Sequence, residues 1–418
     1  MNDDKEKLLA IDAIQKKLLG KKLTYPEVYA IMDEIAKEKL SDVLTTYFVA
    51  SSFKEGYTSQ ELFFFTKAMV ETGNKLKFKG IVADKHSVGG IAGTRTTMII
   101  VPIIAAAGFK IPKISSRAIT TPAGTADVME AIASVEFTPK QIEKIVNEVG
   151  GCIAWNGKLG IAPADDIIIR VEEPLSFESF DKIIISVMAK KVAAGTTHLV
   201  LDIPIGKTAK IHRFSEGENV ARKFENLAHH FGIKVICDVN ETLEPAGRGI
   251  GPILEARDVL YVLEQKTDRP LRLEAKSLRL AGKLLDLCYK EKKISKNGED
   301  EAKKILESGT ALKKFQEIVK AQGGDHKITS DSLSLAKNKF DFCSSISGKI
   351  KDINNHNLNI VAKILGAPND KKAGIYLLKK LDHSVNKNEP IFTLYSDDKY
   401  RLKEAEATLR NLPIFKIE

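Results

Sequence analysis

The chain has 418 residues, of which 43% are hydrophobic and 28% are charged, and its formal net charge is +9. This length and balance indicate a globular protein of two or three domains with a large core. The longest apolar run, 98–109, contains a proline and is shorter than the roughly 20 residues that span a bilayer, and no signal-peptide pattern opens the chain, so we expect a cytoplasmic protein.

The first part of the chain, about 5–73, has the pattern of a helical region. Apolar residues recur at helical spacing in 6–19, and the segment Leu23-Thr24-Tyr25-Pro26-Glu27 resembles a helix cap with proline in the first turn. Ser41 and the Thr58–Ser59 pair are further expected helix starts.

From about Gly80 onward, short β-branched runs alternate with helical patterns. Buried strands are expected at 80–84, 110–116, 197–206 and 233–240, and helices at 96–108 and 251–265. Segment 162–195 is expected to hold extended pieces that lead into a helix. This alternation predicts βα units around a mainly parallel sheet, and the pattern after about 340 predicts a small α+β unit.

The segment 84–97, "DKHSVGGIAGTRTT", combines a lysine, a histidine, an arginine, hydroxyl residues and three glycines. Hydrogen-bond donors next to a flexible, glycine-rich backbone can surround one phosphate. The helix that follows can also direct its N-terminal amides at the same anion. The lysine precedes the glycines, so the segment matches neither a P-loop nor a dinucleotide fingerprint. Taken alone, it could equally be a tight strand-to-helix turn with a solvated Lys85.

A second polar constellation, "ISSRAITTPAGTADVMEAI", follows the expected strand at 110–116. It places Arg117 and five hydroxyl residues in a short span. Ligands of open parallel sheets bind beyond the carboxyl ends of the strands, so both segments can face one crevice. Together they predict an anion site more strongly than either does alone.

At these residues the chain resembles the thymidine/pyrimidine nucleoside phosphorylase family. "DKHSVGG", "SSRAITTPAGTADVME", "IAPADD" and "SVMAKKVAAGTTHLVLDIPIG" carry the resemblance, which extends to the C-terminal "GAPNDKKAGIYLLKKLDHSVNKNEPIFTLYS". Within the family, "SRAITTPAGTAD" and "PAGRGIGPILEARD" are most similar to the archaeal AMP phosphorylase branch.

The resemblance implies an α/β protein with the nucleoside phosphorylase type II fold. A small helical domain (1–75 and 164–194) would bind the base, a large α/β domain with a mainly parallel sheet (76–163 and 195–335) would bind phosphate, and a small α+β domain (340–418) would end the chain. A homodimer through the helical domain is expected. The AMP enzymes carry an extra N-terminal domain linked to assembly that this sequence does not show, so higher oligomers are not expected.

Carried over position by position, the resemblance implies a phosphate site of five residues: Lys85, Ser87, Thr96, Ser115 and Thr125. It implies that the nucleotide is held by Gly90, Ser116, Arg117, Ala118, Ile119, Thr120 and Thr121. On the helical side it implies base-reading positions at Arg170, Ser186 and Lys190, and a further substrate contact at Lys210. Some family members bind a monovalent cation near the first loop and Glu255.

The residue patterns agree with part of this assignment and leave alternatives. Ser186 and Lys190 are four residues apart and share one helix face, although Lys190 could simply be solvated. Arg170 could be an ordinary salt-bridge arginine. For the proton donor, the AMP enzymes have an aspartate where this chain has Glu178, which can do the same job if burial raises its pKa. Asp181 and His86 are the alternatives, although a lone histidine is more often structural.

The reaction implied is AMP plus phosphate giving adenine plus ribose 1,5-bisphosphate, catalysed by a pentosyltransferase without a cofactor or bound metal. Arg117, Thr120, Thr121 and Arg248 are expected to hold the 5′-phosphate. A thymidine or pyrimidine nucleoside phosphorylase is the alternative within the same class. A non-catalytic nucleotide- or RNA-binding protein is a remote one, because the lysines of 290–322 alternate with acidic residues as on a solvated helix face. We expect no nucleic-acid or membrane partner.

Four scattered cysteines, Cys152, Cys237, Cys288 and Cys343, form no CxxC pair. This spacing argues against a zinc site and against a disulfide framework.

Overall fold

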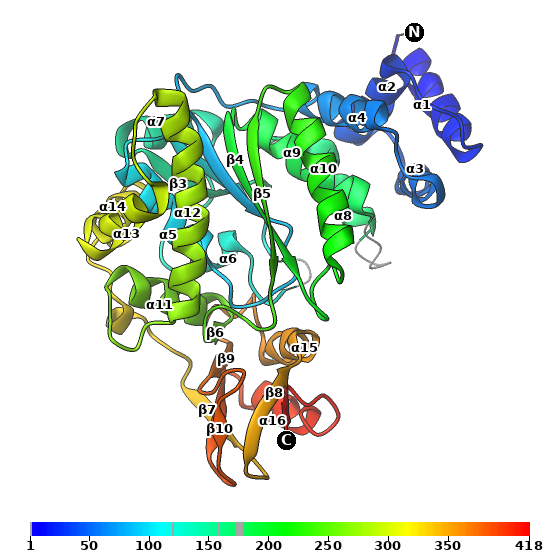
Figure 1. Ribbon diagram of the computed structural model, residues 1–418. Coiled ribbons are helices and arrows are strands. Elements are labelled where there is room, and N and C mark those ends of the chain that lie inside the picture. The colour runs from blue at the N-terminus through cyan, green and yellow to red at the C-terminus, as the bar shows by residue number, and fades with distance from the viewer. Residues whose placement is uncertain (1, 119–120, 158, 173–178) are drawn as a thin grey trace.

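The computed structural model describes residues 2–118, 121–157, 159–172 and 179–418. Figure 1 shows a helical bundle beside a larger α/β body, with the C-terminal unit attached to another end of that body. The expected fold class, a helical domain, an α/β domain with a parallel sheet and a C-terminal α+β domain, is confirmed. None of the helices among the described residues is long and apolar enough to cross a membrane.

The bundle begins with α1 (Asn2–Leu18), α2 (Tyr25–Ala36), α3 (Asp42–Glu55) and α4 (Ser59–Glu71). Thr24 and Thr58 are the N-caps of α2 and α4, and each forms a capping box with the glutamate three residues later. The expected helix starts are therefore confirmed. Later in the chain, α8 (Pro163–Glu172) packs on α2 and α3, and α9 (Phe180–Ala193) packs on α4.

The expectation of extended structure before α9 was wrong, because Pro163 to Glu172 form α8. Pro163 stands in the first turn, where its missing N–H costs no hydrogen bond. Asp165 and Asp166 follow in the same turn, where carboxylates interact favourably with the helix dipole. The β-branched run after them had suggested strand, but packing against α2 and α3 holds it as helix.

The α/β body is built on parallel strands: β1 (Ala83–Ser87), β2 (Ile111–Ser115), β3 (Gly151–Trp155), β4 (His198–Ile205) and β5 (Lys234–Glu241). The strands β1, β4 and β5 pair in that order, and β2 pairs with β3. A parallel bridge between Val82 and Lys110 joins the two groups. The resulting order, β3-β2-β1-β4-β5, reverses direction between β1 and β4, which makes that point the topological switch of the sheet.

Helices cover both faces of this sheet. On one face, α5 (Thr97–Ala106) and α12 (Leu271–Lys292) pack against β1 and β4, and on the other α10 (Phe214–His230) packs against β4 and β5. Successive residues of β4 point to opposite faces of the sheet. Val200 packs in the core with α5 and α12, whereas Leu199 and Leu201 pack in a core shared with the bundle. Further helices complete the body: α6 (Thr125–Glu130), α7 (Pro139–Val149), α11 (Pro252–Leu263), α13 (Gly298–Glu307) and α14 (Thr310–Ala321).

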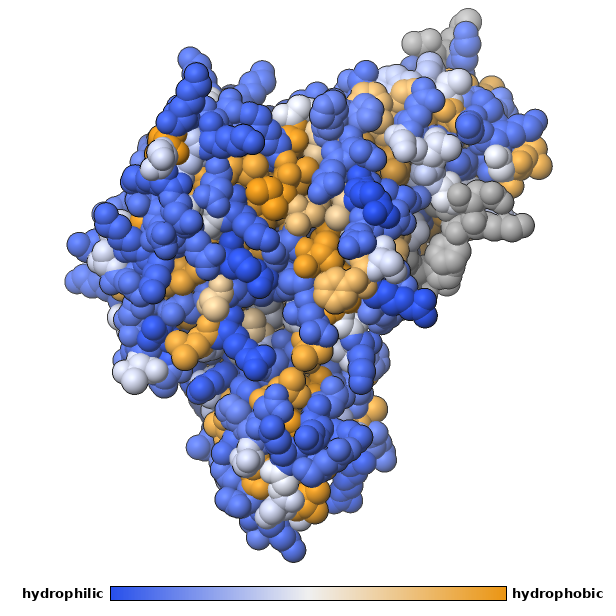
Figure 2. All heavy atoms as spheres, viewed as in Figure 1, coloured by the Kyte–Doolittle hydropathy of each residue, from blue (hydrophilic) through white to orange (hydrophobic). Residues whose placement is uncertain are grey.

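The edge strand β5 is less covered than its neighbours. Its residues Val235, Ile236 and Cys237 are only half-buried. Figure 2 shows a band of apolar side chains on this face of the molecule, in the region where Figure 1 places β5 between α12 and α10.

The C-terminal unit has two small sheets and two helices. Its strands β7 (Asn338–Cys343), β9 (Gly374–Leu377) and β11 (Pro390–Ser396) form a sheet with β6 (Gly249–Ile250), a strand supplied by the α/β body. The other sheet contains β8 (Gly348–Ile353), β10 (Ser384–Val385) and β12 (Phe415–Ile417). Its helices are α15 (Asn355–Leu365) and α16 (Lys399–Thr408), and the 3-10 turn η2 (Ser330–Ser332) leads into the unit.

Candidate functional site

The first polar segment begins inside a strand. The sequence placed a strand at 80–84, but β1 runs from Ala83 to Ser87, so Lys85, His86 and Ser87 are strand residues and not loop residues. They pair with β4 in parallel register, with Ser87 opposite Asp202. Because successive strand residues point to opposite faces, Lys85 and Ser87 share the α12 face and His86 lies on the other.

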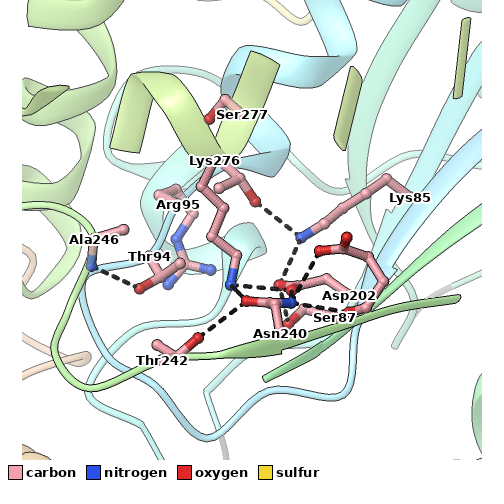
Figure 3. A network of polar contacts seen from close by, with 12 residues as sticks. Lys85, Ser87, Thr94, Arg95, Asp202, Asn240, Thr242, Ala246, Lys276 and Ser277 are labelled. Atoms are coloured by element: carbon pink, nitrogen blue, oxygen red, sulfur yellow. Dashed lines mark hydrogen bonds and ion pairs between the residues drawn. The ribbon is translucent and has the colours of Figure 1, made fainter. Parts of the chain in front are cut away.

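Asp202 on β4 is the centre of a polar network on the α12 face (Figure 3). Its Oδ2 accepts a hydrogen bond of 2.9 Å from the Ser87 hydroxyl and lies 4.0 Å from the ammonium of Lys85. Its Oδ1 accepts from Asn240 at 2.8 Å and pairs with Lys276 of α12 at 3.0 Å. The network joins four elements at the switch point of the sheet.

Lys85 is 2% exposed, and its ammonium donates to the Thr96 hydroxyl at 2.9 Å. Burial lowers the pKa of Lys85 to about 8, although the charge of Asp202 opposes the shift. An ammonium with so little hydration is suited to a compact anion, which would replace the water that it has lost. Thr96 stands immediately before α5, whose N-terminal amides point toward the same region.

Arg95 connects the two polar loops. Its guanidinium donates to the Thr125 hydroxyl at 2.9 Å and to the Ala123 carbonyl at 2.7 Å, both in the second loop. It also lies 2.7 Å from the buried carboxylate of Glu255 on α11. The structure therefore brings Lys85, Ser87 and Thr96 into one network and links Thr125 to it through Arg95, while Ser115 ends β2 at the same edge of the sheet.

Glu255 is the carboxylate that the resemblance associates with a monovalent cation. Here Arg95 Nε donates to its Oε2 at 2.9 Å, and its Oε1 accepts from the amide of Gly251. A monovalent cation at this carboxylate would have to displace the guanidinium. The residues present do not fit such an ion at Glu255.

On the opposite face of β1, Asp84 holds two lysines. Its Oδ2 pairs with Lys191 of α9 at 2.6 Å, and its Oδ1 lies 3.6 Å from Lys113 of β2. All three side chains are buried. Lys113 also donates to the carbonyl of Lys85 at 2.9 Å. This cluster ties the helical bundle to β1 directly behind the Lys85 network.

His86 shares that face of β1. Burial holds the pKa of His86 well below its usual range, and the charges of Lys191, Lys113, Lys85 and Lys190 lower it further. The imidazole is therefore neutral at neutral pH. It can donate one N–H to a ligand, but it is a poor source of a proton.

The predicted base-reading pair lies together on α9. Lys190 pairs with Asp165 of α8 at 2.6 Å, and the Ser186 hydroxyl donates to the same carboxylate oxygen at 2.9 Å. The neighbouring Asp166 is held by the Asn156 amide at 2.7 Å, and burial raises its pKa to about 6. Lys190 is 9% exposed, so the alternative of a solvated lysine was wrong.

Arg170, the third predicted base-reading residue, does not join this pair. Its side chain is 56% exposed and lies 3.3 Å from Asp42 and 3.9 Å from Glu38 in the bundle. In this structure it is an exposed salt-bridge arginine.

Arg117 is occupied by acidic neighbours. Its guanidinium makes a two-point pair with Glu130, at 2.5 and 2.6 Å, and stacks over Trp155 with 4.5 Å to the ring centroid. Asp127 accepts from the amide of Ala118 at 2.7 Å and so shapes the same loop. Ser116 and Thr121 lie beside them, with the Thr121 hydroxyl bonded to the carbonyl of Ala123.

Gly90 and Lys210, two further predicted substrate contacts, are neighbours. A Cβ on Gly90 would lie 3.1 Å from Lys210 Cγ, and the φ of Gly90 is +94°, a conformation that favours glycine. By contrast, Asp181 is committed elsewhere: it accepts from the amide of Tyr57 and pairs with Lys223. It is therefore a poor alternative proton donor. Glu178, Ile119 and Thr120 lie outside the described residues.

Several polar residues of the site were missed from the sequence: Asp84, Arg95, Lys113, Asp165, Lys191, Asp202 and Lys276. A signal existed for some of them. Asp202 and Lys113 interrupt apolar strands, where an ionisable side chain needs a partner. Lys276 lies on a long, lysine-rich helix, and nothing in its spacing distinguished it. On α1 and α2, Glu6, Asp33 and Glu34 bring carboxylates within 4.8 Å of one another, but an acidic trio alone is no metal site.

Three family models match consecutive parts of the chain. Residues 11–73 match the glycosyl transferase family helical bundle domain, residues 79–312 match the a/b domain of that family, and residues 349–414 match the pyrimidine nucleoside phosphorylase C-terminal domain. These ranges correspond to the bundle, the body and the C-terminal unit described above.

Relatives are similar over almost the whole chain. AMP phosphorylase 1 of Archaeoglobus fulgidus is 41% identical over 95% of this chain and 78% of its own length, and AMP phosphorylase of Methanocaldococcus jannaschii is 42% identical over 99% and 82%. Among solved structures, anthranilate phosphoribosyltransferase from Thermus thermophilus has a TM-score of 0.62 and 19% identity, covering 75% of this chain and all of that one, which is a likeness of fold. The chain is thus an enzyme of the glycosyl transferase family, and within it belongs to the pyrimidine nucleoside phosphorylase group that includes the AMP phosphorylases.

Proposed function

We propose that this enzyme catalyses the phosphorolysis of nucleoside 5′-monophosphates, converting AMP and phosphate into adenine and ribose 1,5-bisphosphate. The observation that carries the proposal is the buried Lys85 at the switch point, bonded to Thr96 and facing Ser87 across Asp202. Two relatives that bear the name AMP phosphorylase are 41% and 42% identical to the chain over the aligned residues.

In this reaction phosphate attacks the anomeric carbon on the side opposite the base. The C–N bond breaks, a C–O bond forms, and the departing base takes up a proton. Lys85 and the hydroxyls of Ser87, Thr96, Ser115 and Thr125 would orient the phosphate and balance its charge before the transition state. Arg95 would fix Thr125 in this set through their hydrogen bond.

The base would bind on the bundle side, against Ser186 and Lys190. Glu178 remains our proposed proton donor. His86 would contribute a neutral N–H on the face of β1 toward the bundle, because its lowered pKa leaves it uncharged. Arg170, exposed here and paired with Asp42, would have to leave that salt bridge to reach the base.

The 5′-phosphate of AMP needs a second anion site. We propose the loop of Gly90 with Lys210 and the loop of residues 116–121 for this role. The two-point pair of Arg117 with Glu130 means that a 5′-phosphate would have to compete with a carboxylate for this guanidinium. Arg248 is the remaining arginine expected to contribute.

The proposal includes a cytoplasmic homodimer that needs no metal or organic cofactor. Arg95 would supply the positive charge beside Glu255. For the dimer, large apolar side chains are exposed on the adjoining helices α1 and α3: Leu8, Leu18, Val43 and Tyr47. Figure 2 shows apolar residues at this end of the molecule.

The test is phosphate-dependent release of base from AMP, CMP, thymidine and uridine, with Lys85→Met as the inactive control. Release of adenine from AMP, faster than from the nucleosides, is expected. Preference for thymidine or uridine would instead support the nucleoside phosphorylase alternative. No release from any of them would refute the proposal.

A further inference from the structure

The C-terminal unit reaches into the glycine-rich loop of the α/β body. Asn355, the first residue of α15, donates from its Nδ2 to the carbonyl of Gly90 at 2.6 Å and accepts from the amide of Ala92 at 3.1 Å. Its side chain is 2% exposed. One amide thus satisfies two backbone groups of the loop, as a neighbouring strand would do.

The same loop is held by apolar packing. Ala92 is 1% exposed and belongs to the hydrophobic core of the C-terminal unit, together with Leu358, Val361 and Ile375. The loop therefore inserts a methyl group into a core built by a different domain. A side chain larger than alanine would overfill this position.

A second connection runs through the loop that follows β5. Lys380 of the C-terminal unit is buried and donates to the carbonyls of Pro245 and, at 2.8 Å, Gly247. The amide of Gly247 in turn donates to the carbonyl of Gly93 at 2.8 Å. The C-terminal unit thus holds the glycine loop at both ends.

The loop needs such support because its backbone is intrinsically free. Gly89, Gly90 and Gly93 have φ values of +90°, +94° and +59°, and glycine in such a segment populates many other conformations. Gly90 lies against Lys210 in the observed conformation. Without the Asn355 clamp, the substrate would have to order this loop as it binds. The free-energy cost of that ordering would weaken substrate binding.

We propose that Asn355 is a positioning residue for substrate: it fixes the Gly90–Ala92 segment against Lys210 and so prepares the nucleotide side of the active site. The proposal rests on the proposed function, in which this segment contacts AMP. It gives Asn355 of the C-terminal unit a supporting role at the active site, although no side chain of that unit is assigned to touch substrate.

The experiment compares Asn355→Ala with Asn357→Ala in the full chain. Asn357 is also buried on α15, but its amide donates to Pro413 inside the C-terminal unit at 2.8 Å, which makes it a matched control. In Asn355→Ala we expect the KM for AMP to rise about tenfold, with less than a roughly twofold change in the KM for phosphate. Asn357→Ala should lower Tm without changing either Michaelis constant.

Two further readouts make the result decisive. Hydrogen exchange of peptides covering residues 88–93 should accelerate in Asn355→Ala and not in Asn357→Ala. Asn355→Asp keeps an acceptor for the amide of Ala92 but places a carboxylate oxygen against the Gly90 carbonyl, so it should be at least as impaired as Asn355→Ala. A lower Tm with an unchanged KM for AMP in Asn355→Ala would overturn the clamp alone, whereas a wild-type enzyme without phosphorolysis would overturn both the clamp and the proposed function.

Discussion

The pKa of Lys85 predicts how activity depends on pH. Burial lowers this pKa from the usual 10.5 to about 8, so the free enzyme loses the ammonium proposed to receive phosphate as the pH passes 8. With one titrating group, the protonated fraction falls about tenfold between pH 7 and pH 9. The kcat/KM for phosphate, which reports the free enzyme, should fall by the same factor. The kcat/KM is expressed per phosphate dianion, whose fraction rises over the same pH range, so that the ionisation of phosphate is separated from that of Lys85.

Variants at the same site assign the decline to Lys85. Asp202→Asn removes the charge that opposes the shift, so the falling limb should move to lower pH. Lys85→Arg should abolish the limb, because a guanidinium stays protonated. The assay is initial adenine release at subsaturating phosphate from pH 6.5 to 9.5. An unchanged limb in Asp202→Asn, or no decline up to pH 9.5 in the wild type, would refute the reasoning.

Unfolding cannot account for the same decline. The folded pKa of Lys85 lies below its unfolded value, so the folded state binds fewer protons between about pH 8 and 10.5. The contribution of this group destabilises the folded state fully below about pH 8, and this penalty shrinks as the pH rises toward 10.5, so the free energy of unfolding increases over the range in which activity is expected to fall. A Tm measured at pH 9 provides the control.

Three further predictions concern charged groups around the site. Arg95 supplies the positive charge beside Glu255, so the activity of the wild type should not change when K⁺ is exchanged for Na⁺, and a K⁺ requirement would contradict this prediction. Arg95→Met should lower kcat/KM at least about tenfold, and added guanidinium should restore part of the loss. Asp84→Asn leaves Lys191 buried without its charged partner, so it should lower the free energy of unfolding by about 3–5 kcal/mol, as measured by urea denaturation. A decrease below about 1 kcal/mol would contradict a stabilising buried pair. Arg117→Ala should reduce activity on AMP more than on adenosine if this guanidinium contacts the 5′-phosphate. Equal losses would contradict that contact and leave Arg117 a structural role, paired with Glu130 and stacked over Trp155.

The sequence was most informative where a motif determines local geometry. Capping patterns at Thr24 and Thr58 predicted two helix starts, and β-branched runs predicted four strands of the sheet. The strand β3, Gly151–Trp155, was missed because it follows a helix-ending glycine and contains a single β-branched residue, Ile153. α8 was mistaken for extended structure because the packing that stabilises it comes from residues more than a hundred positions earlier.

The hydrogen-bond donors of the polar segments were predicted, but the charged residues that contact them from other elements were not. Lys85 and the hydroxyl residues stand in recognisable segments, whereas Asp202 and Lys276 reach them from β4 and α12. Such partners depend on strand register and helix packing, which local sequence does not encode. Arg117 shows the converse: its segment suggested an anion ligand, but Glu130, 13 residues later, occupies its guanidinium.

The anchoring of α9 suggests how the bundle can move without disturbing the base-reading pair. Asp84 fastens Lys191 to β1 near the C-terminal end of α9, two residues before the helix ends and close to Gly195, whose φ is +73°. At a rise of about 1.5 Å per residue, Ser186 lies about 7 Å from this anchor and Phe180 about 16 Å.

A rotation of about 10° around this anchor would move Ser186 by about 1 Å and Phe180 by about 3 Å, since displacement grows with distance from a hinge. The proposed base-reading pair would therefore stay in register with the proposed phosphate site, whereas the start of α9 at Phe180 would travel furthest.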